Sequence, residues 1–335
     1  MITYAQSISQ ALDYKLKKDK NVILLGEDVC DPYGGAFKIT KGLSTKYPDQ
    51  VINTPMSEWA LTGLAAGLAM RGIRPILEIM FGDFLTLCAD QLINHATKFG
   101  WMYKGKVTVP MVIRTPMGGR RGYGPTHSQT LEKLFLGIPG LKIIAPSHFH
   151  DPGEQLIKAI EDNDPVLFIE NKVLYTREID ELENGHIFDY SARKSKDEYE
   201  TIILSNNDFK EHQVTVLTYG GMLPWVTVAL NELLLEDEVT SEIIVPSYIN
   251  KASMPEILES VEKTGRLVIV EEGTLFNGWG AEMAAQVIND GFELLESPVK
   301  RVAAKNVPIA NTKILEDAVL PQVVDIKKAV EEVLK

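Results

Sequence analysis

The chain contains few cysteines and no long apolar segment. Its 335 residues include two cysteines, Cys30 and Cys88, in unrelated sequence contexts, which excludes a disulfide framework and a thiolate zinc cluster. No apolar run approaches the roughly 20 residues that a membrane span requires. The N-terminal residues lack the basic-then-apolar pattern of a signal peptide. We therefore predict a cytoplasmic protein that does not contact a membrane.

Clusters of basic residues are also scarce. The formal net charge is −12, and the basic residues are scattered except at Arg120 and Arg121. Binding to a phosphate backbone requires clustered positive charge, so nucleic acid is not an expected partner. A P-loop and a Rossmann dinucleotide fingerprint are absent too, since Gly63 and Gly67 lie inside a predicted helix. Simple phosphotransfer and nicotinamide chemistry are thus disfavoured.

The hydrophobic pattern predicts two α/β domains. Its short β-branched runs are too apolar to alternate, which is typical of strands buried on both faces of a parallel sheet. We expect a first domain over residues 1–178, a polar connecting segment over 179–213, in which an ordered hairpin is one alternative, and a second domain over 214–335. The expected strands are 21–26, 51–54, 74–79, 107–114, 141–145, 165–169, 214–219, 241–245, 266–270 and 299–302. The expected helices are 5–18, 58–71, 84–99, 151–162, 224–236, 253–263, 279–290 and 324–334.

Glu58 stands at the start of an almost wholly apolar helical segment, directly after Thr54-Pro-Met-Ser57. A carboxyl group in apolar surroundings retains its proton more readily and can donate it to a bound heterocycle. The alternative is that an acidic residue in the first turn only stabilises the helix dipole. The residues alone leave both interpretations open.

A glycine-rich loop over residues 116–129 follows another predicted strand and ends in His127-Ser-Gln129. Ligand sites of open α/β sheets lie at the carboxyl ends of strands, and histidine exchanges protons near neutral pH. A structural hydrogen bond is the alternative role for His127, although so many glycines indicate a loop shaped around a ligand. Phe81 and Phe84 also follow a strand, where an aromatic ring either stacks on a flat ligand or fills the core.

Further motifs are spread over nearly the whole chain in a fixed order. They are Gly26-Glu-Asp-Val29, Tyr33-Gly-Gly-Ala-Phe-Lys-Ile-Thr-Lys-Gly-Leu43, Thr54-Pro-Met-Ser-Glu58, Asp90-Gln-Leu-Ile-Asn94, Gly124-Pro-Thr-His-Ser-Gln129, Ile138-Pro-Gly-Leu-Lys142, Asp164-Pro-Val166, Thr218-Tyr-Gly-Gly221, Lys263-Thr-Gly-Arg-Leu-Val-Ile-Val-Glu-Glu272, Gly280-Ala-Glu282 and Leu320-Pro321. Together they resemble the β subunit of the thiamine-diphosphate-dependent 2-oxo acid dehydrogenases of the pyruvate, branched-chain and acetoin types. The resemblance implies an α/β fold: a parallel-sheet, transketolase-like pyrimidine-binding domain followed by a transketolase C-terminal-like domain.

The resemblance also implies a cofactor site for thiamine diphosphate. The family's glutamate at the position of Glu58 hydrogen-bonds the ring nitrogen N1′ of the aminopyrimidine and so activates the cofactor. Phe84 matches the aromatic residue that stacks on this ring, and Met56 and Glu27 match residues of the same pocket. His127 matches the histidine that lines the entrance and assists acyl transfer to a lipoyl group.

Metal ions and partner chains follow from the same resemblance. The chain contains no Gly-Asp-Gly motif, the segment that binds Mg²⁺ and the diphosphate in thiamine enzymes. These ligands are expected from an α subunit, in a heterotetramer of two α and two β chains, with a lipoyl acyltransferase as a further partner. A structural potassium site is implied at Met111, Ala159, Ile160, Asp162 and Asp164. The alternative for the last two residues is a plain turn.

The expected function is that of a β subunit which, with its α subunit, decarboxylates a 2-oxo acid and passes the acyl group to lipoamide. One alternative is a subunit of a split transketolase-like or acyloin-forming enzyme, in which the cofactor-bound enamine attacks an aldehyde. Another is a non-catalytic scaffold subunit, against which the presence of Glu58, Phe84 and His127 argues. The sequence does not identify the 2-oxo acid, because the α subunit contributes most of the substrate contacts.

Overall fold

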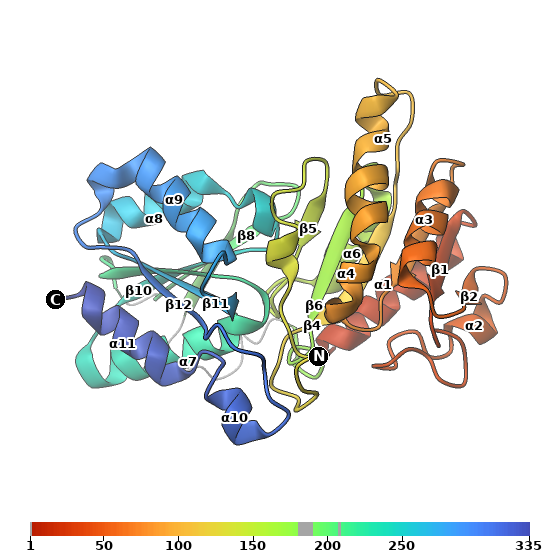
Figure 1. The fold of residues 1–335 in the computed structure, drawn as a ribbon. Helices are drawn as coiled ribbons and strands as arrows, with labels where there is room; N and C mark the ends of the chain where they lie inside the picture. The colour runs from red at the N-terminus through yellow and green to blue at the C-terminus, as the bar shows by residue number, and fades with distance from the viewer. Residues whose placement is uncertain (1, 180–189, 207–208) are drawn as a thin grey trace. The chain divides into compact units, whose positions relative to one another are not determined.

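The computed structural model describes residues 2–179, 190–206 and 209–335, and the chain divides into two compact units. Each unit contains a β-sheet covered by helices (Figure 1). Unit 1 comprises Met1–Met117, Leu134–Ile144 and Asp151–Ile179, and unit 2 comprises Gly118–Lys133, Ala145–His150 and Asp180–Lys335. Two short segments within the first 178 residues thus belong to unit 2.

The sheet of unit 1 is parallel, with the strand order β2-β1-β3-β4-β6-β5. β4 and β6 are buried along their whole length, as expected when helices cover both faces of a sheet. The strands are β1 Val22–Gly26, β2 Val51–Asn53, β3 Arg74–Glu78, β4 Val112–Met117, β5 Lys142–Ile144 and β6 Val166–Asn171. The expected parallel α/β fold is confirmed.

The helices of unit 1 begin at recognisable sequence signals. α1 starts with a capping box, in which Thr3 and Gln6 exchange hydrogen bonds of 3.3 and 2.8 Å. α6 starts after Asp151, whose carboxylate accepts from the Gly153 amide at 2.9 Å. The helical segments are α1 Tyr4–Lys18, α2 Leu43–Lys46, α3 Glu58–Ala69, the 3₁₀ turn Gly82–Phe84, α4 Leu85–Asp90, the π-helical turn Gln91–Ala96, α5 Thr97–Met102 and α6 Pro152–Glu161. α1 packs against α6, and α3 packs against α4.

The sheet of unit 2 is mixed, with the strand order β12-β11-β9-β10-β8-β7. β12, β11, β9 and β10 are parallel, whereas β8 pairs antiparallel with β10 and with β7. The strands are β7 Tyr190–Lys194, β8 Thr201–Asn206, β9 Val214–Thr218, β10 Ser241–Pro246, β11 Leu267–Thr274 and β12 Lys300–Ala304. The segment 179–213, expected to be a connector, thus contains the alternative hairpin, which extends this sheet.

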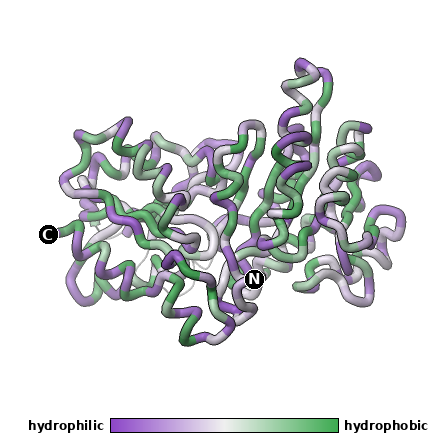
Figure 2. Tube along the Cα trace, in the orientation of Figure 1, coloured by the Kyte–Doolittle hydropathy of each residue, from purple (hydrophilic) through white to green (hydrophobic). Residues whose placement is uncertain are grey.

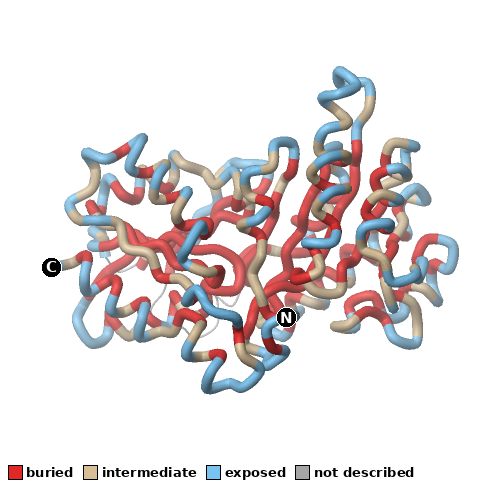
Figure 3. The backbone as a smooth tube through the Cα atoms, viewed as in Figure 1, coloured by how far each residue is buried: buried red, intermediate tan, exposed pale blue. Residues whose placement is uncertain are grey.

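Hydrophobic strands form the core of unit 2 (Figure 2), and the same strands are buried (Figure 3). Val216 of β9, Ile243 of β10 and Val268 of β11 belong to one cluster with Leu230 and Val330 from the helices. The helices are α7 Leu223–Asp237, α8 Met254–Thr264, α9 Trp279–Gly291, α10 Lys313–Asp317 and α11 Val323–Val333. Burial of each of these side chains stabilises the folded state by roughly 1.5–3 kcal/mol. The cluster therefore holds the second sheet to its helices.

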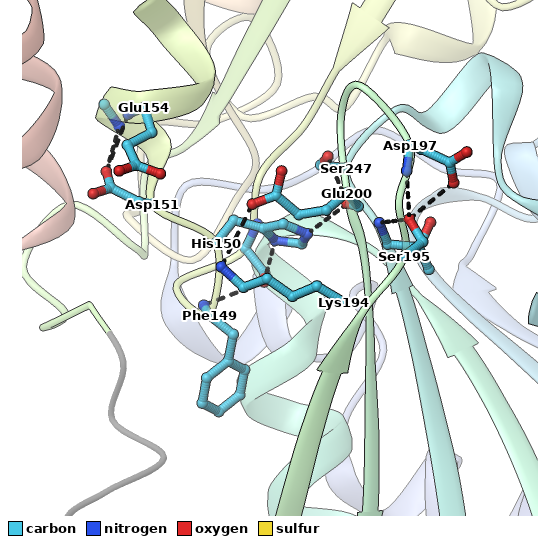
Figure 4. A network of polar contacts seen from close by, with 12 residues as sticks. Phe149, His150, Asp151, Glu154, Lys194, Ser195, Asp197, Glu200 and Ser247 are labelled. Carbon is cyan, nitrogen blue, oxygen red and sulfur yellow. Dashed lines mark hydrogen bonds and ion pairs between the residues drawn. The ribbon is translucent and has the colours of Figure 1, made fainter. Parts of the chain in front are cut away.

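Hydrogen bonds explain why the segment Ala145–His150 belongs to unit 2 (Figure 4). The Ala145 amide donates to the Ser247 carbonyl at 2.7 Å, and the two ring nitrogens of His150 contact the Ser147 hydroxyl at 2.8 Å and the Glu200 carbonyl at 3.2 Å. The next residue, Asp151, caps α6 in unit 1. The boundary between the units therefore falls between two adjacent, firmly bonded residues.

Candidate active site

Glu27 and Glu58 follow neighbouring strands at the carboxyl edge of the sheet in unit 1. Glu27 comes directly after β1, and Glu58 is the first residue of α3, which follows β2. β1 and β2 pair in parallel with Gly26 opposite Asn53, and the Thr54 amide donates to the Gly26 carbonyl at 3.0 Å. Because parallel strands end at the same edge, this pairing places both carboxyl groups where α/β sheets bind ligands.

The two carboxyl groups interact electrostatically. Burial raises the pKa of Glu27, the negative charge of Glu58 raises it further, and a hydrogen bond from the Ser57 main chain opposes the rise. Among the described residues, Oε1 of Glu27 and Oγ1 of Thr54 are buried and have no hydrogen-bond partner. Buried polar atoms are normally paired. A polar ligand that bonds to these atoms fits the site.

Glu58 itself is half-buried at the N-terminus of α3. The Ser57 side chain makes no capping hydrogen bond, and Glu58 is the acidic residue in the first turn of this helix. Behind it, the Thr62 hydroxyl donates to the Glu58 carbonyl at 2.7 Å and the Cys88 thiol lies 3.8 Å from the same oxygen. Burial raises the pKa of Cys88 to about 12, so this thiol stays protonated and is not a nucleophile.

Aromatic rings gather after β3. Phe84 ends the 3₁₀ turn that follows this strand, with its ring 6.0 Å from that of Phe81 in an edge-to-face arrangement. Phe81 in turn lies 5.8 Å from Phe37. Phe84 and Phe81 are both half-buried, and Met56 is 83% exposed beside Glu58 in the chain. The edge-to-face contact holds the Phe84 ring in a fixed orientation.

His127 lies in unit 2, in the glycine-rich loop, whereas the other proposed cofactor residues lie in unit 1. Its ring nitrogen Nδ1 is 2.9 Å from the Thr126 hydroxyl, and its amide donates to the Gly124 carbonyl at 3.3 Å. Gly124 has a φ of +79°, a conformation that favours glycine. The imidazole is half-buried and its neighbour Ser128 is buried. The loop thus forms a tight turn directly before the histidine.

The residues of the expected potassium site gather at the C-terminal end of α6 in unit 1, and their oxygens already accept hydrogen bonds. The carbonyls of Ile160 and Asp162 each accept from the Arg74 guanidinium at 2.8 Å, and the Asp162 carboxylate pairs with Lys142 at 2.5 Å. Lys142 also lies 3.6 Å from the Asp164 carboxylate. The Met111 carbonyl accepts from an amide of β6, and Ala159 is buried within α6. Arg74 therefore donates to two of the expected carbonyl ligands and Lys142 lies beside both carboxylates, while the potassium site itself stays a prediction.

Sequence reasoning missed a buried ionic network at the carboxyl ends of β3, β4 and β6. Arg114 binds both carboxylate oxygens of Glu170 at 2.7 and 2.8 Å and pairs with Glu78. Tyr175 donates to Glu170 at 2.8 Å, and burial raises the pKa of Glu78. The sequence signal for this network was a charged residue within each of three largely apolar strands. Removing such a charge from a buried pair is strongly destabilising.

Known proteins match the chain over nearly its full length. The model of the transketolase pyrimidine-binding domain matches residues 1–178, and that of the transketolase C-terminal domain matches residues 206–326. The β subunit of acetoin:2,6-dichlorophenolindophenol oxidoreductase from Cupriavidus necator is 36% identical over 338 residues, which covers 98% of this chain and 96% of the relative. The pyruvate dehydrogenase E1 component subunit beta from Rickettsia bellii is 36% identical over 333 residues, covering 99% and 98%. The chain belongs to the β-subunit family of the thiamine-diphosphate-dependent 2-oxo acid dehydrogenases.

The fold of this β-subunit homologue also resembles a solved structure. A split-gene transketolase, described as an inactive β4 tetramer, superimposes with a TM-score of 0.75 at 18% identity, covering 100% of this chain and 99% of that one. The match supports the transketolase-like fold predicted from the sequence. By its family, the chain is a subunit of an oxidoreductase of the thiamine-diphosphate-dependent 2-oxo acid type.

Two features are absent from the described part of this β-subunit homologue. None of its described helices is both long and apolar enough to cross a membrane. Likewise, no group of three or more His, Cys, Asp or Glu side chains among the described residues is placed to hold a metal ion.

Proposed function

We propose that this chain is the β subunit of a 2-oxo acid dehydrogenase that, with an α subunit, decarboxylates a 2-oxo acid and transfers the acyl group to lipoamide. The observation that supports it most is the pair formed by Glu27 and Glu58 at the carboxyl edge of a parallel sheet, with the partnerless Oε1 of Glu27 beside it. The 36% identity to pyruvate and acetoin β subunits adds independent support.

Thiamine diphosphate, when bound, supplies the electron sink that decarboxylation requires. The carboxyl group of Glu58 would hydrogen-bond the aminopyrimidine at its ring nitrogen and share one proton with it. Glu27, whose ionised form is disfavoured by burial and by the Glu58 charge, keeps the pair from carrying two full negative charges. The ring of Phe84 would cover the aminopyrimidine, and Met56 would contribute to the same pocket. His127 would donate a proton to the lipoyl sulfur that is released when the disulfide bond opens during acyl transfer.

An α subunit supplies the Mg²⁺ ligands and the diphosphate site in this proposal, in a heterotetramer of two α and two β chains. Support comes from the sequence, which has no Gly-Asp-Gly motif. Apolar side chains of the packed helices α3 and α4 are also exposed: Trp59 at 55%, Leu64 at 50% and Leu87 at 51%. Neighbouring exposed apolar residues of this size are typical of a protein interface. A lipoyl acyltransferase is the acceptor-bearing partner. Potassium at the C-terminal end of α6 is a separate prediction, because Arg74 and Lys142 already contact several of its expected ligands.

The test is reconstitution of the full chain with its α subunit, thiamine diphosphate and Mg²⁺. Release of carbon dioxide from pyruvate and branched 2-oxo acids is measured with 2,6-dichlorophenolindophenol as artificial acceptor, and acetoin is assayed as a separate substrate. Glu58→Gln should lower the turnover by about 100-fold or more, because an amide cannot supply the carboxyl proton. Glu154→Gln is the matched control, since Glu154 is an exposed glutamate in the first turn of α6.

Turnover of Glu58→Gln within a few-fold of the Glu154→Gln control contradicts the role of Glu58. A second assay compares acceptors. His127→Ala should reduce transfer to lipoamide more than reduction of the dye. Transfer to an added aldehyde instead of lipoamide would support the transketolase-like alternative.

A further inference from the structure

The loop that carries His127 is bonded at its beginning to carboxylates of unit 2. The Gly119 amide donates to Glu272 at 2.6 Å, and the amides of Arg120 and Gly122 donate to the two oxygens of Glu316 at 2.7 and 3.3 Å. Glu272 belongs to β11 and Glu316 to α10, and both are buried. Hydrogen bonds from backbone amides to ionised carboxylates are among the stronger ones in proteins. These contacts fix the path of the chain before it reaches the histidine.

Arg120 contributes a second anchor through its side chain. Its guanidinium lies 3.9 Å from the ring centre of Trp225 on α7 and donates to the Pro321 carbonyl at 2.5 Å. The residue has a φ of +67°, a left-handed conformation that is uncommon for residues other than glycine. A non-glycine residue adopts such a conformation only where its surroundings hold it there. The side-chain contacts of Arg120 with Trp225 and Pro321 stabilise this conformation.

The residues that directly follow this loop are also fixed within unit 2. Glu132 accepts a hydrogen bond of 2.6 Å from the Tyr219 hydroxyl group, at the end of β9. Lys133 bonds to the Thr274 hydroxyl and donates to the Phe276 carbonyl at 2.9 Å. His127 thus lies between two fixed ends, in a loop whose glycines would otherwise allow many conformations.

We propose that Arg120 is a positioning residue, which with Glu316 and the Glu132–Tyr219 pair holds the glycine-rich loop in the one conformation that presents His127 for acyl transfer. The inference rests on the proposed function for the role of His127. It assigns a role to Arg120, a basic residue that the proposed cofactor site does not use. A histidine on a loose loop spends little time in a productive orientation, so the transfer step slows while cofactor chemistry in unit 1 is unaffected.

The test compares Arg120→Gly with Arg121→Gly in the full α/β complex. Both variants remove one guanidinium and add one glycine at adjacent positions, but the Trp225 and Pro321 contacts belong to Arg120. Glycine also accepts the left-handed backbone without strain, so loss of the anchor is the main change in Arg120→Gly. Hydrogen exchange of the amides of residues 118–131 is measured by mass spectrometry together with the two acceptor assays.

We expect the loop amides to exchange about 10-fold faster in Arg120→Gly than in Arg121→Gly. Lipoamide-dependent turnover should fall by about 10-fold in Arg120→Gly, with dye reduction within about 2-fold of the wild type. Arg120→Lys keeps the charge but lacks the planar guanidinium, so its exchange rate and lipoamide-dependent turnover should lie between those of the wild type and Arg120→Gly. This variant replaces Arg120→Gly in the test if Arg120→Gly does not fold. Loop exchange rates in Arg120→Gly equal to those of the wild type overturn the proposal. Absence of decarboxylation in the wild-type complex would overturn the proposed function instead, while the exchange rates would still report the anchor.

Discussion

The Tyr219 hydroxyl group donates a hydrogen bond of 2.6 Å to Glu132, and this pair is buried in unit 2. Burial is the main cause that raises the pKa of Glu132 to about 7, the hydrogen bond from Tyr219 lowers it, and the charges of Glu271 and Glu272 on β11 raise it. Burial also raises the pKa of Tyr219 well above its usual value, so the phenol remains a donor. Glu132 is therefore a buried acid that titrates near neutral pH.

The stability of unit 2 should fall as the pH rises through the pKa of Glu132. The pKa of this carboxyl is about 7 in the folded state and near its ordinary value of 4.5 in the unfolded state. The folded state binds the proton of Glu132 more tightly than the unfolded state does. The stabilisation from this proton is therefore fully present below pH 4.5 and is lost as the pH rises through about 7. The loss amounts to about 3 kcal/mol at most, from about 1.4 kcal/mol per pKa unit.

Glu132→Gln should remove this pH dependence, because the amide keeps an acceptor for Tyr219 and carries no charge. Differential scanning calorimetry of the chain at pH 5 and pH 8 measures it. Glu282→Gln, at an exposed glutamate of α9, is the control and should follow the wild type. A melting temperature of Glu132→Gln that falls between pH 5 and pH 8 as much as that of the wild type contradicts the assignment.

Removal of Arg114 should destabilise unit 1 strongly. Arg114→Met leaves the buried carboxylates of Glu78 and Glu170 without their cation, which costs about 3–5 kcal/mol. Thermal unfolding measures the loss, and Arg71→Met, at an exposed arginine of the same unit, should change the melting temperature little. If both variants melt together with the wild type, the network does not stabilise the sheet.

The Glu27–Glu58 interaction can be tested without any cofactor. Because the Glu58 charge contributes to the raised pKa of Glu27, Glu58→Gln should lower the pKa of Glu27 toward its ordinary value. Carbon-13 NMR of labelled glutamate side chains follows this titration. Asp28→Asn removes a smaller contribution, so it should lower the pKa of Glu27 less. An unchanged titration of Glu27 in Glu58→Gln shows that the two carboxyl groups do not interact.

Much of the fold could be predicted because apolar runs and capping residues report local structure. β1, β6 and α1 begin within one residue of the expected positions. β4 begins at Val112, later than expected, because its pairing with β3 and β6 begins at that residue. No local pattern assigns residues 118–133 to unit 2, because that assignment depends on partners such as Glu272 and Glu316, far away in the sequence. The family resemblance indicated Glu27 and Glu58 as cofactor residues. No local pattern predicts that they lie at the same sheet edge, because this arrangement arises from the pairing of β1 with β2.

The Arg74 guanidinium contacts carbonyl oxygens of the expected potassium site at the C-terminal end of α6. Since the Ile160 and Asp162 carbonyls both accept from Arg74, we expect potassium to add no stability beyond that of sodium in the wild type. Arg74→Gln should lower the melting temperature by about 4–8 °C, from about 2 kcal/mol for the lost charged hydrogen bonds. Potassium should then restore part of this loss, because the two carbonyls become available to the ion. Thermal unfolding in matched potassium and sodium chloride measures both effects. A wild-type melting temperature that rises with potassium and not with sodium would show that the ion binds beside Arg74, as the family resemblance implies.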